Sequence, residues 1–348
     1  MNKIIDLRSD TVTLPTKEMR EAMKNAELGD DVFQEDPTVN KLEDLAAQKL
    51  GMERALLVTS GTQGNVIAIT THTNRGQEVI VEAKSHIYNY EVGAMGVIAH
   101  TLPRVIDGEK GFLPPEQIEK AIRSEDVHAP RTGLICVEDT HNMEGGVIIT
   151  PQQLQSIKKV ADQHNIPVYL DGARIFNAAV ALDTDVKEFT QHVDSMMVCL
   201  SKGLSAPVGS ILAGSKEFIH EARRIRKMLG GGMRQAGIIA APGIVALEKM
   251  IPRLAEDHRN AHILAELLNA IDGIHVDMDD VQTNIVMAKV DGLPVSPETF
   301  VERMADQGIK FLALPYFPTK VRLVTHRGIT KEDVEYVAEQ IRTTVQTL

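Results

Sequence analysis

Residues 196–210, MMVCLSKGLSAPVGS, give the strongest indication of the fold. Its first five residues are all apolar, and such a run is typical of a strand buried on both faces of a parallel sheet. Small, turn-forming residues follow at once, so the strand ends beside Lys202 and leaves its amine at the rim of the sheet. A lysine at a strand end is ordinarily a solvated charge, and only further residues can give it a chemical role.

The segments around this strand repeat an alternation of short apolar runs and amphipathic stretches. We predict seven strands in this part of the chain: 55–59, 78–82, 97–102, 134–138, 168–171, 196–200 and 210–213. Residues 114–124 and 151–165 each open with proline, which a helix tolerates in its first turn. Strands joined by helical crossovers predict an α/β fold with a mainly parallel seven-stranded sheet.

The pattern changes after residue 250, where helices are mixed with alternating strands. Helices are predicted at 253–268, 297–306 and from 331, and strands at 284–290, 309–313 and 321–325. A chain of 348 residues also exceeds the usual size of one core. We therefore expect an N-terminal arm (1–14), a large domain (15–250) and a smaller C-terminal α+β domain (251–348).

Charge and cysteine content narrow the function classes. The formal net charge of −11 disfavours a nucleic-acid or anionic-membrane partner, because polyanions would be repelled. Cys136 and Cys199 each lie in an apolar run without metal-ligand spacing, as expected of buried thiols in a reducing compartment. The N-terminus becomes charged too early for a secretory signal, and the apolar stretch 237–247 is too short to span a bilayer. We expect a cytoplasmic protein.

Two segments with glycine spacing are candidate phosphate sites. Residues 209–216, GSILAGSK, reverse the lysine and serine of a phosphate loop, and no GxGxxG run follows a strand, so nucleotide chemistry is disfavoured. Residues 60–65, SGTQGN, follow a strand and open an apolar helix, so backbone amides and two hydroxyls could hold a phosphate. The same residues would equally serve as an ordinary helix cap.

The residues at the next strand end favour the phosphate interpretation. Asp171 ends the strand 168–171, and Arg174 stands three residues on. A right-handed crossover would place Asp171 and Lys202 at the same sheet edge, where ligands bind. A carboxylate for a ring nitrogen, an arginine, an aldehyde-trapping lysine and a phosphate cup together indicate pyridoxal 5'-phosphate. The alternative is a turn with a local ion pair.

Six segments in unbroken order resemble the low-specificity L-threonine aldolases, pyridoxal-phosphate enzymes of the aspartate aminotransferase fold. They are DLRSDTVT (6–13), GDDVFQEDPTVN (29–40), SGTQGN (60–65), DGARIFNA (171–178), CLSKGL (199–204) and GGGMRQ (230–235). The resemblance, which extends to about residue 326, implies reversible cleavage of L-threonine or L-allo-threonine to glycine and acetaldehyde. It also implies a homo-oligomer, commonly a tetramer built of two dimers, with active sites shared between subunits.

The resemblance assigns several residues to the cofactor. Lys202 would form the Schiff base, Asp171 would pair with the pyridine nitrogen, Arg174 would face the phenolic oxygen, and Ser60, Gly61 and Thr62 would hold the phosphate. His86, in KSHIYNYE, matches a position whose ring stacks on the cofactor. Without the resemblance, His86 would be taken as an ordinary surface or core histidine.

Other residues are assigned to the substrate or to a neighbouring subunit. Arg322, in the alternating strand VRLVTH, would bind the substrate carboxylate together with Ser9 and Arg174, since a guanidinium can bind bidentately. On its own, Arg322 would be read as a solvent-facing charge. Lys227 and Arg234 lie in a basic stretch, and the resemblance assigns them to a cofactor phosphate, that of the neighbouring subunit.

The base that takes the β-hydroxyl proton remains open. His86 and His128 are the candidates because histidine titrates near neutral pH, and His141 is a third possibility. Phe33 and Asp139 stand where relatives often carry tyrosine and asparagine, and we expect both to affect selectivity at the β-carbon.

No metal is expected. An ion near the loop that bears Thr11 and Thr13 would be compatible with the resemblance, but no carboxylate cage demands one.

Two alternative functions are kept. The first is another pyridoxal-phosphate lyase acting on β-substituted amino acids, although 4% aromatic residues and no tryptophan give no sign of a pocket for a ring. The second is a non-catalytic regulator that binds the cofactor, which would normally need a DNA-binding module that the sequence does not indicate.

Overall fold

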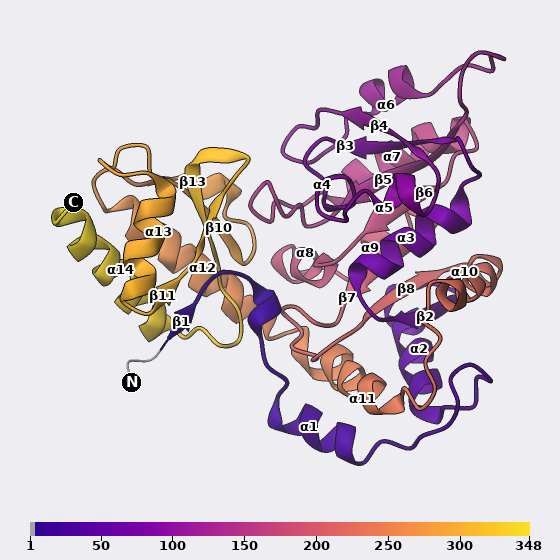
Figure 1. The fold of residues 1–348 in the computed structure, drawn as a ribbon, viewed down its shortest axis with the longest axis horizontal. Coiled ribbons are helices and arrows are strands. Elements are labelled where there is room, and N and C mark those ends of the chain that lie inside the picture. Colours follow the sequence, from indigo (N-terminus) through magenta and orange to yellow (C-terminus); the bar gives the residue numbers. More distant parts are fainter. Residues whose placement is uncertain (1–3) are drawn as a thin grey trace.

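The protein is described by a computed structural model of residues 4–348; residues 1–3 of the expected N-terminal arm lie outside the described residues. Figure 1 shows two lobes, a large one built around a long sheet and a smaller one that contains the C-terminus. None of the helices within residues 4–348 is both long and apolar enough to cross a membrane.

The large lobe contains a seven-stranded sheet in the order β2-β8-β7-β6-β5-β3-β4. The strands are β2 (Arg54–Val58), β3 (Glu78–Glu82), β4 (Leu102–Ile106), β5 (Thr132–Glu138), β6 (Val168–Asp171), β7 (Ser195–Cys199) and β8 (Ser210–Gly214). Neighbouring strands are parallel except for β8, which runs antiparallel to both β2 and β7. The predicted mainly parallel α/β sheet is confirmed.

The prediction of a strand at 97–102 is wrong. Ala94–Val97 forms the short helix α5, and β4 begins only at Leu102. Between them the chain turns at His100, which has a positive φ, and the Thr101 hydroxyl donates to the Met95 carbonyl at 3.0 Å. Val97 and Ile98 are exposed, with Val97 at 73%, whereas Ala99 is buried in the core on the α3 side of the sheet. Of the apolar residues that suggested a strand, Leu102 alone belongs to the sheet.

Helices cover both faces of this sheet. They are α1 (Lys17–Lys24), α2 (Pro37–Leu50), α3 (Gly61–His72), α4 (His86–Asn89), α5, α6 (Pro115–Ala121), α7 (Pro151–Gln163), α8 (Ile175–Ala181), α9 (Lys187–Thr190), α10 (Lys216–Met228) and α11 (Gly237–Val245). One core lies between the sheet and α2, α7, α8 and α11, and the other lies between the sheet and α3, α5 and α10. Pro151 stands in the first turn of α7, as its sequence predicts, and Thr150 adds a capping box.

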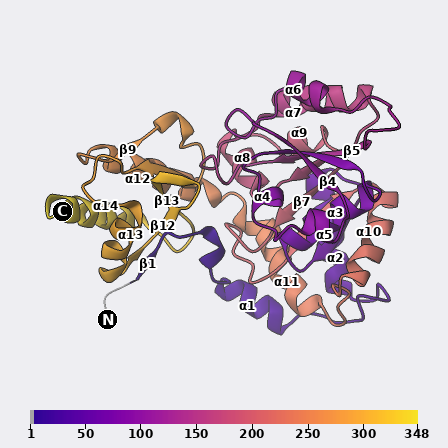
Figure 2. The same ribbon diagram turned by 45° about the horizontal axis from the view of Figure 1, so that its top comes forward.

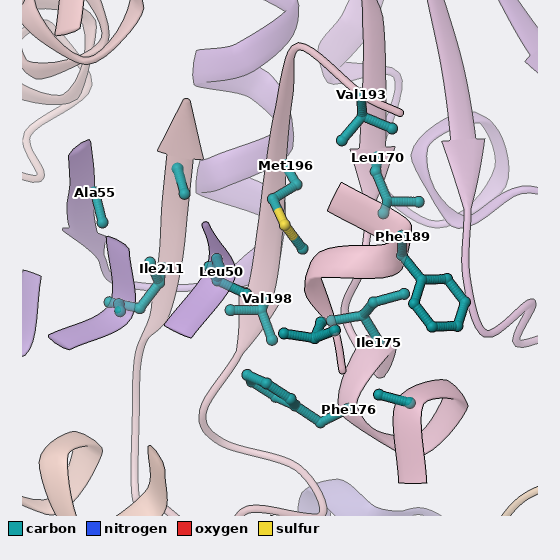
Figure 3. Close-up of a cluster of buried hydrophobic side chains, with 14 of the residues drawn as sticks. Leu50, Ala55, Leu170, Ile175, Phe176, Phe189, Val193, Met196, Val198 and Ile211 are labelled. Atoms are coloured by element: carbon teal, nitrogen blue, oxygen red, sulfur yellow. The ribbon is translucent and has the colours of Figure 1, made fainter. Parts of the chain in front are cut away.

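Strand β7 is buried on both faces, as its continuous apolar sequence predicts. Figure 3 shows Met196 and Val198 on one face, packed beside Ile175 and Phe176 of α8. Met197 belongs to the core on the opposite face. The burial of β7 on both sides brings its carboxyl end, and the lysine that follows it, into the interior of the lobe.

The small lobe has an antiparallel sheet in the order β12-β13-β10-β9, covered by three helices. These elements are β9 (His275–Val276), β10 (Ile285–Lys289), β12 (Leu312–Leu314), β13 (Phe317–Val324), α12 (Leu254–Asn269), α13 (Pro297–Asp306) and α14 (Lys331–Gln346). The last residue of the large lobe's core is Leu254. The small lobe's core contains Ile5 and Leu7 of the arm and then residues from Ala261 onward. The boundary predicted near residue 250 remains a proposal.

The N-terminal arm connects the two lobes. Strand β1 (Ile5–Asp6) pairs in parallel with β11 (Ile309–Lys310), and Ile5 and Leu7 belong to the small lobe's core. The chain then forms a short 3-10 helix, Asp10–Val12, and enters α1 beneath the large lobe, as Figure 2 also shows. The arm thus passes the junction between the lobes.

Candidate active site

A cavity of about 340 Å³ lies where the carboxyl ends of β5, β6 and β7 face the small lobe. It is lined by three parts of the chain that are far apart in sequence. The arm contributes Ser9 and Thr11, the large lobe contributes most of the polar groups, and the small lobe contributes residues 312–315 and Arg322. This is the edge at which parallel α/β sheets bind ligands.

Lys202 lies in the turn after β7 and lines this cavity. Its carbonyl accepts hydrogen bonds from the Thr13 hydroxyl at 2.8 Å and from the Ser205 N–H at 2.9 Å. These contacts fix the backbone that carries the side chain. The amine itself makes no hydrogen bond or ion pair with any of residues 4–348. The turn therefore presents an uncommitted amine to the cavity.

Asp171, at the end of β6, is buried beside this amine. Its two oxygens accept hydrogen bonds from the Asn65 side-chain amide at 2.9 Å and from the Ala173 N–H at 3.2 Å. Burial raises the pKa of Asp171 to about 6, and the charge of Glu138 adds to the effect. A carboxyl group of this kind can share a proton with a basic ring nitrogen.

Glu91 fixes the His86 ring by a contact at Nδ1. The His86 side chain is 34% exposed, and its Nδ1 lies 3.0 Å from Oε1 of Glu91, which is almost fully buried. Burial opposes a charge on His86, but the neighbouring carboxylates of Glu91 and Asp171 outweigh it and raise the pKa of the ring. Ligand atoms of His86, Glu91 and Asp171 lie within 4.8 Å of one another, so this acidic corner suits a cationic group such as a protonated ring nitrogen.

Two arginines meet at the opposite side of the cavity. Arg174 forms a buried bidentate ion pair with Asp10 of the arm, both contacts being 2.7 Å. Oδ1 of Asn142 accepts from Nη1 of Arg322 at 3.0 Å and from Nη1 of Arg174 at 3.3 Å. It lies between the two guanidinium groups.

Arg322 is the arginine whose charge is not neutralised. Its guanidinium has no carboxylate partner within residues 4–348, and its buried Nε makes no hydrogen bond there. Burial and the nearby charge of Arg174 lower the pKa of Arg322 to about 10. A largely buried cation that lines the cavity without a carboxylate partner is suited to an anion such as a substrate carboxylate.

The amino end of α3 forms the third wall. The Ser60 hydroxyl accepts from the Gln63 N–H at 3.1 Å, so Ser60 acts as the helix cap; it is exposed and does not line the cavity, whereas Gly61 and Thr62 do. A Cβ on Gly61 would lie 3.0 Å from Cε of Met197 on β7, so glycine lets the helix end approach the strand closely. The N–H groups at this helix end can bind an anion.

Several predicted residues lie outside the cavity of their own chain. His128 is in the exposed loop before β5, at the opposite edge of the sheet from the cavity. His141 is buried, with Nε2 3.0 Å from Oε2 of Glu82, and it does not line the cavity either. Arg234 forms an ion pair with Asp30 at 3.0 Å, and Lys227 lies near the end of α10. A role for His128, Lys227 or Arg234 in this chemistry would require a second subunit.

Residues that the sequence interpretation did not single out complete the site. Asn142 lies four residues after the end of β5, and no motif marks it. Asp10, Asn65 and Glu91 lie inside quoted segments, but the sequence interpretation gives none of them a role. All four residues act by forming hydrogen bonds or ion pairs with other side chains of the site. The spacing of residues in the sequence does not reveal such contacts.

Comparison with known proteins identifies the family. The beta-eliminating lyase family matches residues 6–291. Low-specificity L-threonine aldolase 1 of Arabidopsis thaliana is 43% identical, over 95% of this chain and 94% of its own length. The low specificity L-threonine aldolase of Escherichia coli K12 is 42% identical, over 97% of this chain and 98% of its own.

Solved structures agree on the fold. A Leishmania major threonine aldolase has a TM-score of 0.84 at 20% identity, over 98% of this chain and 99% of that one. An aspartate aminotransferase from Rhizobium meliloti has a TM-score of 0.71 at 16% identity, over 99% of this chain and 92% of its own. The chain belongs to the beta-eliminating lyase family and, within it, to the low-specificity L-threonine aldolases.

The protein is therefore a pyridoxal-phosphate-dependent lyase, as the resemblance implied. The cavity fits this cofactor. It offers an uncommitted lysine amine, an acidic corner for the ring nitrogen, an arginine held by Asp10 and a helix end with free N–H groups.

Proposed function

We propose that this protein cleaves L-threonine or L-allo-threonine reversibly to glycine and acetaldehyde. The proposal is supported by the relatives named as threonine aldolases, which match nearly the whole chain. The observation that carries it is that the uncommitted Lys202 amine and the unneutralised Arg322 guanidinium face one cavity. Covalent attachment and carboxylate binding are the two functions that an amino-acid lyase of this family requires.

We assign the cofactor contacts to Lys202 as the Schiff-base lysine, Asp171 at the pyridine nitrogen, Arg174 at the phenolic oxygen, and the Ser60–Gly61–Thr62 helix end at the phosphate. Pyridoxal phosphate, when bound, accepts the electron pair that is released as the Cα–Cβ bond breaks. Asp171 would support this by favouring a proton on the ring nitrogen. Hydrogen bonds from Asn65 and Ala173 hold the Asp171 carboxylate in place.

Arg322 and Ser9 orient the substrate. Ser9 caps the short helix of the arm and lines the cavity, and Arg322 lines it with a guanidinium that no carboxylate of residues 4–348 neutralises. Binding at this point fixes one end of the amino acid, and the orientation about Cα then decides which bond breaks.

We propose His86 as the group that accepts the β-hydroxyl proton. In the tautomer that donates Nδ1–H to Glu91, Nε2 carries a free lone pair and meets no partner within residues 4–348. The charge of Glu91 also increases the basicity of the ring. His128 could take this role only from a neighbouring subunit.

Product analysis tests the proposed reaction. Purified enzyme with the cofactor is incubated with L-threonine and, separately, with L-allo-threonine. Equal amounts of glycine and acetaldehyde are expected. Ammonia and a 2-oxo acid without glycine would instead point to β-elimination, in keeping with the description of the wider family, and would overturn the proposal.

Replacing Arg322 with alanine should weaken substrate binding and leave the cofactor in place. Loss of charge-assisted hydrogen bonds to the carboxylate should lower kcat/KM roughly 10- to 100-fold, mainly through KM. Steady-state kinetics and the absorbance of the bound cofactor measure the two effects. Lys320→Ala, another cation on β13 that does not line the cavity, is the control. Loss of the cofactor from Arg322→Ala would contradict the assignment.

We also propose a cytoplasmic homotetramer, a dimer of dimers in which Lys227 and Arg234 reach a neighbouring cofactor phosphate. Exposed apolar side chains such as Phe33, Val92 and Val97 support an interface, and the free, buried Cys136 and Cys199 suit a reducing compartment.

Mixed subunits test the sharing of sites. Lys202→Ala and Arg234→Ala variants should each be impaired alone, and mixtures reassembled from both should regain activity, because a hybrid dimer contains one complete site. Light scattering gives the oligomer size. No recovery in verified hybrids would mean that each chain completes its own site.

A further inference from the structure

Glu138, the last residue of β5, places a buried carboxylate between two loops of the site. It is 5% exposed. Its Oε2 accepts from the backbone N–H of His86 at 2.5 Å, and its Oε1 accepts from the backbone N–H of Asn142 at 2.8 Å. Among residues 4–348, no lysine, arginine or histidine forms an ion pair with this carboxylate. The charge is held by two main-chain amides from different loops.

The two loops have different tasks. The loop after β3 carries His86, whose ring lines the cavity and is held at Nδ1 by Glu91. The loop after β5 carries Asn142, whose side-chain oxygen accepts from Arg322. A shift of Glu138 would therefore displace both the histidine ring and the group that orients the arginine.

We propose that Glu138 is a positioning residue, whose carboxylate fixes the His86 loop and the Asn142–Arg322 contact together. The identity of the substrate in this inference rests on the proposed function. Glu138 has no need to touch the reacting atoms, because it acts through the two backbone amides.

The negative charge of Glu138 also has an electrostatic effect on the pKa values of its neighbours. The charged groups that face His86 are Glu91 from its own loop, Asp171 at the end of β6 and Glu138 at the end of β5. Burial lowers the pKa of His86, and these three carboxylates raise it. Removing the charge of Glu138 should therefore lower the pKa of His86, and it should lower that of Asp171 as well.

The neighbouring strand offers a matched control. Glu82 ends β3, is 2% exposed and likewise accepts from two backbone amides, those of Lys84 at 2.6 Å and Gly108 at 3.3 Å. It also contacts His141, but it does not line the cavity. Glu82→Gln thus removes a structurally similar carboxylate at the same sheet edge. Its contacts in the two loops are Lys84 and His141, which do not line the cavity, and it leaves the backbone amides of His86 and Asn142 with their Glu138 partner.

The experiment compares Glu138→Gln, Glu138→Asp and Glu82→Gln with the wild-type holoenzyme. A glutamine keeps the shape but turns an NH₂ group toward one backbone N–H. For Glu138→Gln we expect KM for L-threonine to rise about tenfold, because the Arg322 contact is disturbed. The acid limb of the kcat/KM profile and the pH midpoint of the cofactor absorbance should both move to lower pH.

The other two variants separate the two effects. Glu138→Asp keeps the charge but shortens the side chain, so KM should rise while the acid limb stays near its wild-type position. Glu82→Gln should lower the thermal midpoint and leave KM and both pH midpoints unchanged. If Glu138→Gln does not fold, Glu138→Asp decides the positioning role.

Two results would overturn the proposal. One is a Glu138→Gln variant that loses thermal stability as Glu82→Gln does while keeping wild-type KM and pH midpoints. The other is a Glu138→Asp variant with wild-type KM. If the wild type does not cleave L-threonine at all, the proposed function fails. The absorbance midpoint and the dissociation constant of glycine, followed by the cofactor spectrum, would still test Glu138.

Discussion

Lys202→Ala should lower threonine cleavage by roughly four to six orders of magnitude, the loss typical of removing a covalent nucleophile. The Lys202 amine is the uncommitted group that faces the cavity, and the nearby Asp171, His86 and Arg322 have no amine that could replace it. The variant should fold normally, because its backbone contacts with Thr13 and Ser205 use only the carbonyl.

Two measurements establish this result. Glycine formation gives the rate, and the absorbance of the purified protein shows whether the lysine-dependent yellow band has been lost. Lys216→Ala, which replaces an exposed lysine at the start of α10, should behave as wild type. A Lys202→Ala enzyme that kept the band and most of its turnover would show that another amine holds the cofactor.

Asp10→Ala should cost about 3–5 kcal/mol of folding free energy, because it leaves the Arg174 guanidinium charged and buried without its partner. Side-chain exposure is 0% for Asp10 and 5% for Arg174, and both contacts are 2.7 Å. Urea unfolding, with the cofactor at a fixed concentration, measures the loss. Activity should fall too, since Arg174 and the Ser9 segment share this anchor.

The pH dependence of stability gives a second measurement on the same pair. Burial opposes the charge of Asp10, but the Arg174 charge and its hydrogen bonds hold the pKa of this carboxyl well below the usual range. A lowered folded-state pKa means that the pair stabilises fully above the unfolded pKa of about 3.9 and that this stability is lost as the pH falls below it. Asp10→Ala should therefore lose less stability than wild type between about pH 4 and pH 2.

The control for this prediction is an exposed ion pair. Asp44 contacts Arg54 at 3.3 Å, with side-chain exposures of 72% and 55%. Asp44→Ala should change stability by about 1 kcal/mol or less. If Asp10→Ala were equally mild, the arm would not be anchored in solution as it is in the structure.

The sheet and the cofactor were accessible from sequence because they depend on local patterns. Continuous apolar runs marked β3, β6 and β7 nearly to the residue, and turn residues marked where Asp171 and Lys202 would stand. The strand expected at 97–102 failed because apolarity alone does not distinguish a strand from an exposed helical turn followed by a reversal at His100.

The supporting groups of the site could not be found in this way. Glu91, Glu138 and Asn142 each contact a distant part of the chain, namely Asn65, His86 and Arg322 respectively, and those contacts exist only after the sheet has formed. His128 shows the opposite difficulty. Its residue type suited a base, but its loop lies at the wrong edge of its own chain's sheet.

The arm also bears on how the protein is made. Asp10 leaves the ribosome early, but its partner Arg174 follows 164 residues later, and β1 must await β11 near residue 309. At ordinary rates of synthesis the arm would wait roughly ten seconds or more for Arg174 and longer still for its strand. The first segment to be translated is thus among the last to form its native contacts. Until then the nascent chain has no complete cavity in which to bind the cofactor.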